Sequence, residues 1–439
     1  MKYDYAEIKS TPNYIKIGSL EECLDNFPEE QIKESREKYR KIIEPWISAA
    51  LQSEHLSVLF GAGLTMAVCQ NAGIKPSSMA SVNFGEFTEK INKYAQNEAK
   101  KMKRGQPNIE DQIRTAFSLL NGYEIDENYK SASAMRNLLN DVLREFSASI
   151  LSSETQLSHS LESSDLATQS NALHSLSLLI SFLSTFSSRT ATRERTHIFT
   201  TNYDRFIEYG CDLAGIKILD RFWGKIAPRF QESPVNIDYY YHMPDVKNEF
   251  RFAEGVIRYS KIHGSIDWYD KNGIVFRDAL RFGADKIDLP YGSNYSDHLM
   301  IYPNSMKSVE TAFYPYSELF RDFSMEICRP NTTLFTYGYG FGDSHINKTL
   351  REMLSIPSAH IFIIAYSIDD KLIDFLSRIN MAQVSLLAGQ EFGNLENLIN
   401  FYLPKSAINT ITETASHLVD ARKGYTEIIK GGEIDDQNS

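Results

Sequence analysis

A short apolar run that ends abruptly in glycines limits the fold of this chain more than any other feature. The run 56–60, Leu-Ser-Val-Leu-Phe, is followed directly by Gly61-Ala62-Gly63. A buried strand that leads into a glycine turn opens a dinucleotide-binding fold, in which the bare backbone approaches a pyrophosphate at a helix N-terminus. Position 66 is Met instead of the usual third glycine, and no P-loop lysine follows. A strand-to-helix turn without a ligand therefore remains an alternative.

The remaining apolar runs predict an α/β fold with a Rossmann-like, mainly parallel sheet. Residues 66–195 contain little strand signal and several stretches with helical spacing, which predicts a large helical insertion. We expect an N-terminal helical segment at 1–50, a nucleotide-binding domain at 51–390, and a C-terminal helix with a disordered tail at 391–439. Within the first segment, the helix is expected from Glu21 to Ala50. Further strands are expected at 197–200, 256–262, 298–302, 333–337 and 360–365.

Polar and glycine-rich segments follow several of these strands, where an open parallel sheet binds its ligands. Thr201-Asn202-Tyr203-Asp204 offers an amide that can orient a water and a carboxylate that can accept from ribose hydroxyls, although Asp204 could instead cap the next helix. His263 precedes Gly264 and could act as a base or bind a hydroxyl. The loop after 333–337 contains Gly340-Phe341-Gly342-Asp343, and Tyr366 follows the last strand as an edge for an adenine ring or as part of an ordinary loop.

Composition excludes several classes of protein. Forty-six Lys+Arg against 57 Asp+Glu give a net charge of −11, which argues against a free-standing nucleic-acid binder. The basic and aromatic residues of 221–229 could contact a strand of nucleic acid, but a surface turn with a buried aromatic explains them as well.

The four cysteines contain no CxxC pair, so we expect no zinc ribbon, no metal site and no disulfide framework. The N-terminus does not resemble a signal peptide, and the most apolar run, 176–186, is too short to cross a bilayer. We expect a cytoplasmic protein.

In this order, the four motifs Gly61-Ala62-Gly63, 201–204, His263-Gly264 and 340–343 resemble the Sir2 (sirtuin) superfamily, especially the SIR2-like branch of bacterial anti-phage defence systems. The resemblance covers roughly 55–90 and 195–390. Sirtuin deacylases continue the first motif with a Gly-Ile-Pro-Asp-Phe-Arg segment and carry a four-cysteine zinc module, and neither is present in this chain.

The resemblance implies that NAD⁺ is a substrate and that the chain hydrolyses its nicotinamide–ribose bond, which depletes the infected cell of NAD⁺ in abortive infection. It implies that Asn202 and His263 are catalytic, with Asn202 placing water and His263 binding a ribose hydroxyl and acting as base. The binding residues would hold the phosphates, the nicotinamide ribose and the adenosine, and they are Gly61, Ala62, Gly63, Thr65, Thr201, Asp204, Gly340, Phe341, Gly342, Asp343 and Tyr366.

Two other functions are also compatible with the sequence. A protein deacylase would need a peptide groove, and a sensor would hold an NAD-derived nucleotide without cutting it. The resemblance also implies a homo-oligomer and, as a further partner, a HerA-type ATPase or a phage-derived trigger. Direct contact with membrane or nucleic acid is not expected.

Overall fold

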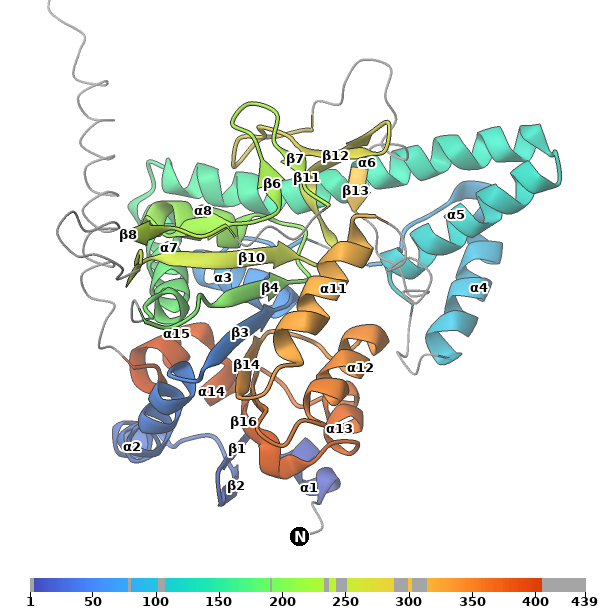
Figure 1. Ribbon diagram of the computed structural model, residues 1–439. Coiled ribbons are helices and arrows are strands. Elements are labelled where there is room, and N and C mark those ends of the chain that lie inside the picture. Colours follow the sequence, from blue (N-terminus) through green and yellow to red (C-terminus); the bar gives the residue numbers. More distant parts are fainter. Residues whose placement is uncertain are drawn as a thin grey trace, which may run out of the picture.

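A nine-stranded sheet forms the centre of the molecule, with helices on both faces (Figure 1). The computed structural model describes residues 4–77, 80–101, 107–189, 192–232, 237–241, 251–287, 299–301 and 314–404. The strand order is β2-β1-β16-β15-β14-β3-β4-β10-β5, and all neighbours from β16 to β5 are parallel. The predicted α/β fold with a mainly parallel sheet is confirmed. Its strands are β1 (Asn13–Ile17), β2 (Leu20–Leu24), β3 (His55–Phe60), β4 (His197–Thr200), β5 (Lys217–Leu219), β10 (Val256–Lys261), β14 (Thr332–Tyr337), β15 (His360–Ala365) and β16 (Val384–Gly389).

The sheet is covered on both faces because successive side chains of its strands enter opposite cores. Phe60 packs with the helices of one face, whereas its neighbour Leu59 belongs to the core on the other face. The first face carries α2 (Ile32–Leu51), α3 (Ala62–Ala72), α7 (Leu166–Ser187) and α8 (Phe206–Ala214). The second face carries α1 (Tyr5–Ser10), α11 (Tyr316–Ile327), α12 (Ser344–Met353) and α13 (Asp370–Leu376).

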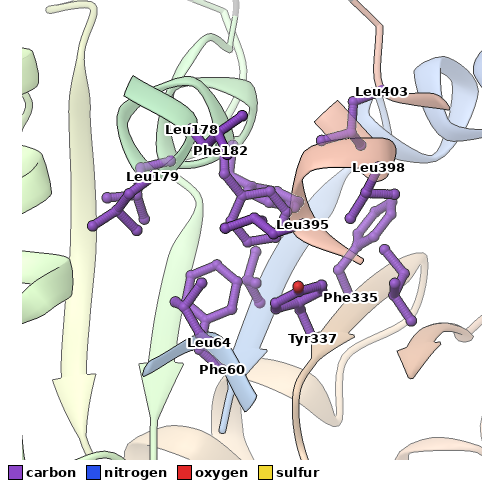
Figure 2. Packing of buried hydrophobic residues seen from close by; sticks show 14 of the residues in the cluster. Phe60, Leu64, Leu178, Leu179, Phe182, Phe335, Tyr337, Leu395, Leu398 and Leu403 are labelled. Carbon is purple, nitrogen blue, oxygen red and sulfur yellow. The ribbon is translucent and has the colours of Figure 1, made fainter. Parts of the chain in front are cut away.

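Aromatic packing fixes α7 on the first face. The Phe182 ring lies 4.9 Å from the Tyr337 ring and 5.4 Å from the Phe60 ring, so one helix residue contacts both β14 and β3. Figure 2 shows these side chains together with Leu395 and Leu398, which belong to the same cluster and come from the C-terminal elements. The C-terminal elements are α14 (Gln390–Gly393), α15 (Leu395–Asn397) and a π-helix (Leu398–Tyr402). Residues 405–439 of the expected C-terminal helix and tail lie outside the described part of the chain.

The inserted helices divide between two environments, which refines the expected module at 66–195. Helices α4 (Thr88–Lys101), α5 (Ile109–Ile125) and much of α6 (Tyr129–Leu161) share a core of their own, which includes Tyr203 and Ile266. Helices α3 and α7 instead belong to the layer that covers the central sheet. The 3₁₀ turn Gly85–Phe87 precedes α4. The structure therefore places only the middle of the expected module apart from the sheet.

The N-terminal prediction was partly wrong. Strands β1 and β2 form a hairpin, and β1 pairs antiparallel with β16, so this segment completes the central sheet. The helix expected from Glu21 begins at Ile32, after the 3₁₀ turn Glu29–Gln31. Strand β2 lies at the edge of the sheet and alternates between half-buried and exposed residues, but its sequence Leu-Glu-Glu-Cys-Leu does not alternate in polarity and so does not reveal a strand.

A smaller antiparallel sheet lies beside the carboxyl end of β10, in the order β13-β11-β12-β7-β6. The strand expected at 298–302 is β13 of this sheet and not a strand of the parallel sheet. Among the described helices, none combines the length and apolar character needed to cross a bilayer. The remaining elements are β6 (Phe222–Trp223), β7 (Arg229–Phe230), β11 (Gly264–Lys271), β12 (Ile274–Arg277), β13 (Leu299–Ile301), the pair β8 (Tyr240–Tyr241) and β9 (Arg251–Phe252), and the 3₁₀ turn Met381–Gln383.

Candidate functional site

Four parallel strands end in one row at the same edge of the sheet. Tyr337 of β14 pairs with Phe60 of β3, Phe60 pairs with Thr200 of β4, and Thr200 pairs with Lys261 of β10. The chain leaves β3 for β4 on one side and later returns to β14 on the other side, so the strand order reverses at β3. Open α/β sheets bind ligands at such a point. Since Asn202 and His263 each lie two residues beyond this row, the register brings their backbones to the same edge.

A cavity of about 570 Å³ opens at this edge, within the size range of small-molecule sites. Its wall is formed by the loops after β3, β14 and β15 and by the first turn of α5. Tyr366 lines it as well and is 46 % exposed. Nine of the predicted binding residues line it, and these are Gly61, Ala62, Gly63, Thr201, Gly340, Phe341, Gly342, Asp343 and Tyr366.

Several helix N-termini meet at this cavity. Gly61 and Asp343 occupy the N-cap positions of helices α3 and α12, and no side chain caps either helix. The side chain of Asp343 therefore does not cap α12. Backbone carbonyls accept from the N–H groups of Gly63 and Leu64, so the positive end of α3, rather than a set of free N–H groups, would favour an anion there. Lys371 is the single basic side chain among the described residues that line the cavity.

The structure corrects the reason for the glycines at 61 and 63. A Cβ at Gly61 would lie 2.5 Å from the carbonyl oxygen of Gly338. A Cβ at Gly63 would lie 2.5 Å from the Cα atom of Gly338. The backbone nitrogen of Gly63 also donates to Gly338 O at 3.0 Å. These two glycines let the turn after β3 pack against the loop after β14, rather than simply leaving room for a ligand.

Gly340 has the opposite surroundings. A Cβ built at this position meets no protein atom within 4 Å, although the residue lines the cavity. The loop around it is held by Asn347, whose Nδ2 donates to Phe341 O at 2.8 Å and whose Oδ1 accepts from Tyr339 Oη at 3.0 Å. Phe341 has a left-handed backbone with φ 49°. The loop is thus fixed by its neighbours, and position 340 leaves space for another molecule.

Asn202 lies directly behind the glycine turn. Its Nδ2 donates to Gly61 O and to Thr65 Oγ1, each at 3.0 Å. The side chain is 6 % exposed, and its Oδ1 atom is buried without a hydrogen-bond partner in the described part of the chain. A buried acceptor without a partner is costly, and such atoms are rare in folded proteins. The amide oxygen is therefore a candidate contact for a substrate or a water.

Thr65 and Asp204 were expected to bind the ligand, but neither residue lines the cavity. Thr65 Oγ1 donates to Asp204 Oδ2 at 2.6 Å, and Asp204 Oδ1 accepts from the backbone nitrogen of Phe206 at 3.3 Å. Both residues are buried. Because both carboxylate oxygens of Asp204 are engaged, its observed contacts match the alternative in which it supports the start of α8. We therefore assign Thr65 and Asp204 to the support of Asn202.

His263 also lies just behind the cavity wall, with 7 % of the side chain exposed. Its Nε2 is 3.8 Å from Oδ2 of Asp343, which lines the cavity. The Tyr203 ring lies 6.5 Å from the His263 ring, on the side of the helical module. Neither Asn202 nor His263 is among the residues that line the cavity, but each contacts a residue that does.

The helical module supplies wall residues that the sequence did not reveal. Tyr203 Oη donates to Glu110 Oε1 at 3.1 Å, and Glu110 lies in the first turn of α5. Burial first, and then Glu110, raise the pKa of Tyr203 well above its ordinary value, so the hydroxyl remains a donor. Asn108 and Asp111 form a capping box there and also line the cavity. Asn108 followed by acidic residues is a helix-start signal, but nothing in it indicates contact with the distant glycine turn.

Comparison with known proteins agrees with this arrangement. Residues 196–382 match the family model of the SIR2-like domain. No curated protein matches the chain. The SIR2-like region includes Asn202, His263 and the loop 340–343, whereas Gly61-Ala62-Gly63 precedes it in the chain and joins it in space. A SIR2-like domain indicates an NAD-related function. Across the described residues, no group of three or more His, Cys, Asp or Glu side chains could hold a metal ion.

Proposed function

We propose that this protein is an NAD⁺ glycohydrolase that releases nicotinamide and ADP-ribose. One observation carries the proposal: the unpartnered amide oxygen of Asn202 lies behind a cavity at the switch point of a sheet with a SIR2-like domain. The helix N-termini at Gly61 and Asp343 suit the two phosphates, and the acidic wall around Glu110 and Asp343 suits ribose hydroxyls.

The reaction needs little acid assistance. A water attacks C1 of the nicotinamide ribose while the C–N bond breaks through an oxocarbenium-like state, and the bonding electrons neutralise the cationic ring nitrogen. In the proposal, Asn202 Oδ1 accepts from the water and His263 takes its proton. Asp343, 3.8 Å from His263 Nε2, would stabilise the imidazolium that forms. Tyr366 and 340–342 would hold the adenosine.

The biological role follows from the resemblance to defence-type SIR2-like proteins. We propose that the protein acts in the cytoplasm as a homo-oligomer and depletes NAD⁺ in abortive infection, and that a HerA-type ATPase or a phage-derived trigger activates it. The helical module of α4–α6 is a natural surface for such control because Tyr203 connects it to the site through Glu110.

A second candidate is a sensor that binds an NAD-derived nucleotide without hydrolysis. It is favoured by the absence of Asn202 and His263 from the cavity wall. Incubation of purified protein with NAD⁺, followed by chromatography, separates the candidates. Equal amounts of nicotinamide and ADP-ribose support hydrolysis, whereas bound but intact NAD⁺ at every protein concentration, with and without phage lysate, supports the sensor. Adding an acetyl-lysine peptide tests the deacylase, which would form acetylated ADP-ribose.

The variants Asn202→Ala and His263→Ala test the assigned roles. Each should lower nicotinamide release by about 10²–10⁴-fold, the range associated with general acid–base and electrostatic groups. Asn97→Ala and His159→Ala remove the same side-chain types at exposed positions on α4 and α6 and should retain activity. A folded Asn202→Ala or His263→Ala protein with wild-type turnover would remove that residue from the mechanism.

A further inference from the structure

A second cavity, of about 700 Å³, lies on the other side of the segment that carries Asn202. Its walls come from α8, from the edge strand β5 and its neighbour β10, and from the smaller sheet. Arg205 and Lys261 line this second cavity, and Lys261 Nζ donates to the backbone carbonyl of Asp204. The second cavity and the candidate active site are therefore neighbours that share no lining residue among those described.

The basic side chains of its inner wall already have partners. Lys261 Nζ donates to Glu208 Oε1 at 2.9 Å, and the Arg277 guanidinium pairs with Asp220. Arg205 is paired with Glu154 of α6, at 2.6 Å between Nη2 and Oε2. These cations are committed to protein acceptors and are poorly placed to capture an anionic ligand.

Three side chains around the cavity have buried oxygen atoms that could accept from a further donor. Asp267 is 9 % exposed, its Oδ1 has no hydrogen bond, and its carboxylate forms no ion pair with a described residue. Tyr259, 4 % exposed, directs its hydroxyl at the Glu208 carboxylate, and the hydroxyl oxygen can still accept a hydrogen bond. Glu208 Oε2 is buried beside the Tyr259 hydroxyl. Buried acceptors of this kind are expensive unless a donor reaches them.

The charges of the inner wall do not balance. With the Arg205–Glu154 pair included, the four carboxylates Glu154, Glu208, Asp220 and Asp267 lie against the three cations Arg205, Lys261 and Arg277. Burial is the largest cause that raises the pKa of Glu208 and of Asp220, and the charge of Asp267 raises both further. One negative charge is therefore left without direct compensation.

The residues at the mouth of the cavity do not supply a positive charge that would compensate it. Exposed Lys217 and Lys225 are accompanied there by Asp212 and Asp278. The imbalance thus lies at the inner wall around Asp267.

The aromatic part of the wall limits the kind of cation that fits. Tyr209 and Phe282 stack with ring centroids 3.9 Å apart, and Phe222 and Trp268 lie 4.8 Å apart. Such rings suit methylene groups and also attract a cation through their faces. A metal ion is a poorer match, because no described cluster of three His, Cys, Asp or Glu side chains could hold one and the cavity is much larger than an ion.

We propose that this second cavity binds a small aliphatic amine, with a primary ammonium group at Asp267 and Glu208, a contact to the Tyr259 hydroxyl, and the carbon chain along the aromatic wall. The inference does not depend on NAD⁺ cleavage, because it rests on residues that the proposed reaction does not use.

The test measures thermal unfolding and calorimetric binding of the full chain with two probes, 1,4-diaminobutane and agmatine. Uncharged 1,4-butanediol and NaCl at equal ionic strength are the comparison solutes. At least one amine should raise the Tm of the wild type, while butanediol and NaCl do not. Asp267→Asn should bind that amine about tenfold or more weakly, the expected loss for a hydrogen bond to a charged group.

Two further variants keep the test decisive. Tyr259→Phe should weaken amine binding several-fold, and Asp126→Asn, which removes an exposed carboxylate beyond α5, should leave it unchanged. Without ligand, Asp267→Asn should have a higher Tm than the wild type because an uncompensated buried charge is removed. The proposal is overturned if neither amine binds, if butanediol or NaCl stabilises the wild type equally, or if both Asp267→Asn and Tyr259→Phe bind the amine as tightly as the wild type.

Discussion

The side-chain amide of Asn202 donates a hydrogen bond to the backbone carbonyl of Gly61 at 3.0 Å, and so ties the end of β4 to the glycine turn after β3. A carbonyl oxygen can only accept, so the amide nitrogen must face Gly61 and the amide oxygen must point elsewhere. That oxygen is buried without a described partner. The orientation of the proposed catalytic amide is therefore set by the fold.

Thr65→Val tests whether the support of Asn202 matters. The hydroxyl accepts from Asn202 Nδ2 at 3.0 Å and donates to Asp204 Oδ2 at 2.6 Å, and valine removes both bonds. We expect kcat to fall by about 10²-fold, the scale of a small misplacement, with little change in KM. Thr65→Ser retains the hydroxyl and should recover most of the activity. Steady-state kinetics check this, and equal kcat for valine and serine would contradict the assigned support.

Gly340→Ala tests the ligand side of the cavity. The added methyl group meets no protein atom within 4 Å, so folding stability should change by less than about 1 kcal/mol. KM for NAD⁺ should nevertheless rise by about tenfold if the adenosine lies against this loop. The matched variant Gly61→Ala forces a Cβ to 2.5 Å from Gly338 O and should destabilise the fold by about 1–3 kcal/mol. Urea unfolding and kinetics on both variants check the pair, and an unchanged KM in Gly340→Ala would argue against adenosine there.

Glu154→Gln tests the connection between α6 and the segment that carries Asn202. Glu154 is fully buried and accepts from the backbone nitrogen of Arg205 at 2.8 Å and from its Nη2 at 2.6 Å. Loss of one charge of a buried pair should lower the free energy of unfolding by about 3–5 kcal/mol. Asp141→Asn breaks the exposed pair with Arg144 on the same helix and should cost less than about 1 kcal/mol. Urea denaturation measures both, and equal losses would show that burial of the pair is unimportant.

His197 should make folding sensitive to acid. Its ring is buried against Phe199 at 3.9 Å, and burial, with smaller effects of Arg258 and Arg221, lowers its pKa to about 3. An unfolded histidine has a pKa of about 6.5, so the stability that the neutral ring provides is complete above that pH. It is lost as pH falls from about 6.5 toward 3, with a slope of up to about 1.4 kcal/mol per pH unit.

The matched variant His197→Gln removes this titration and keeps a side chain that can bond Ser260, which lies 3.0 Å from His197 Nε2. Urea unfolding between pH 4 and 7 should show a shallower pH dependence in the variant than in the wild type. The comparison cancels the contributions of other titrating groups. The same slope in both proteins would contradict a buried neutral His197.

Much of the sheet could be predicted because its strands are buried on both faces and appear as continuous apolar runs. Strands β3, β4, β10, β14 and β15 lie where the sequence predicts them. Strand β16 was missed because Val384–Gly389 is a short run without a distinctive motif after it. The β1–β2 hairpin was missed because its edge strand, Leu-Glu-Glu-Cys-Leu, does not alternate polar and apolar residues and lies within a charged segment.

The site was predicted less completely, because its details depend on contacts between distant segments. Motifs at strand ends identify Gly61, Asn202, His263 and Asp343 as neighbours once a parallel sheet is assumed. The sequence does not reveal that Gly338, rather than a ligand, fills the space beside Gly61 and Gly63. It also cannot reveal that α5 contributes Glu110, since that contact arises from the packing of the helical module.

The most direct measurement of the central claim is single-turnover release of nicotinamide from NAD⁺ by purified wild-type and Asn202→Ala proteins of equal Tm. We expect the wild type to release one nicotinamide for each ADP-ribose, and Asn202→Ala to bind NAD⁺ with similar affinity and to release nicotinamide at least about 10²-fold more slowly. Nicotinamide release at the same rate by both proteins would contradict the account.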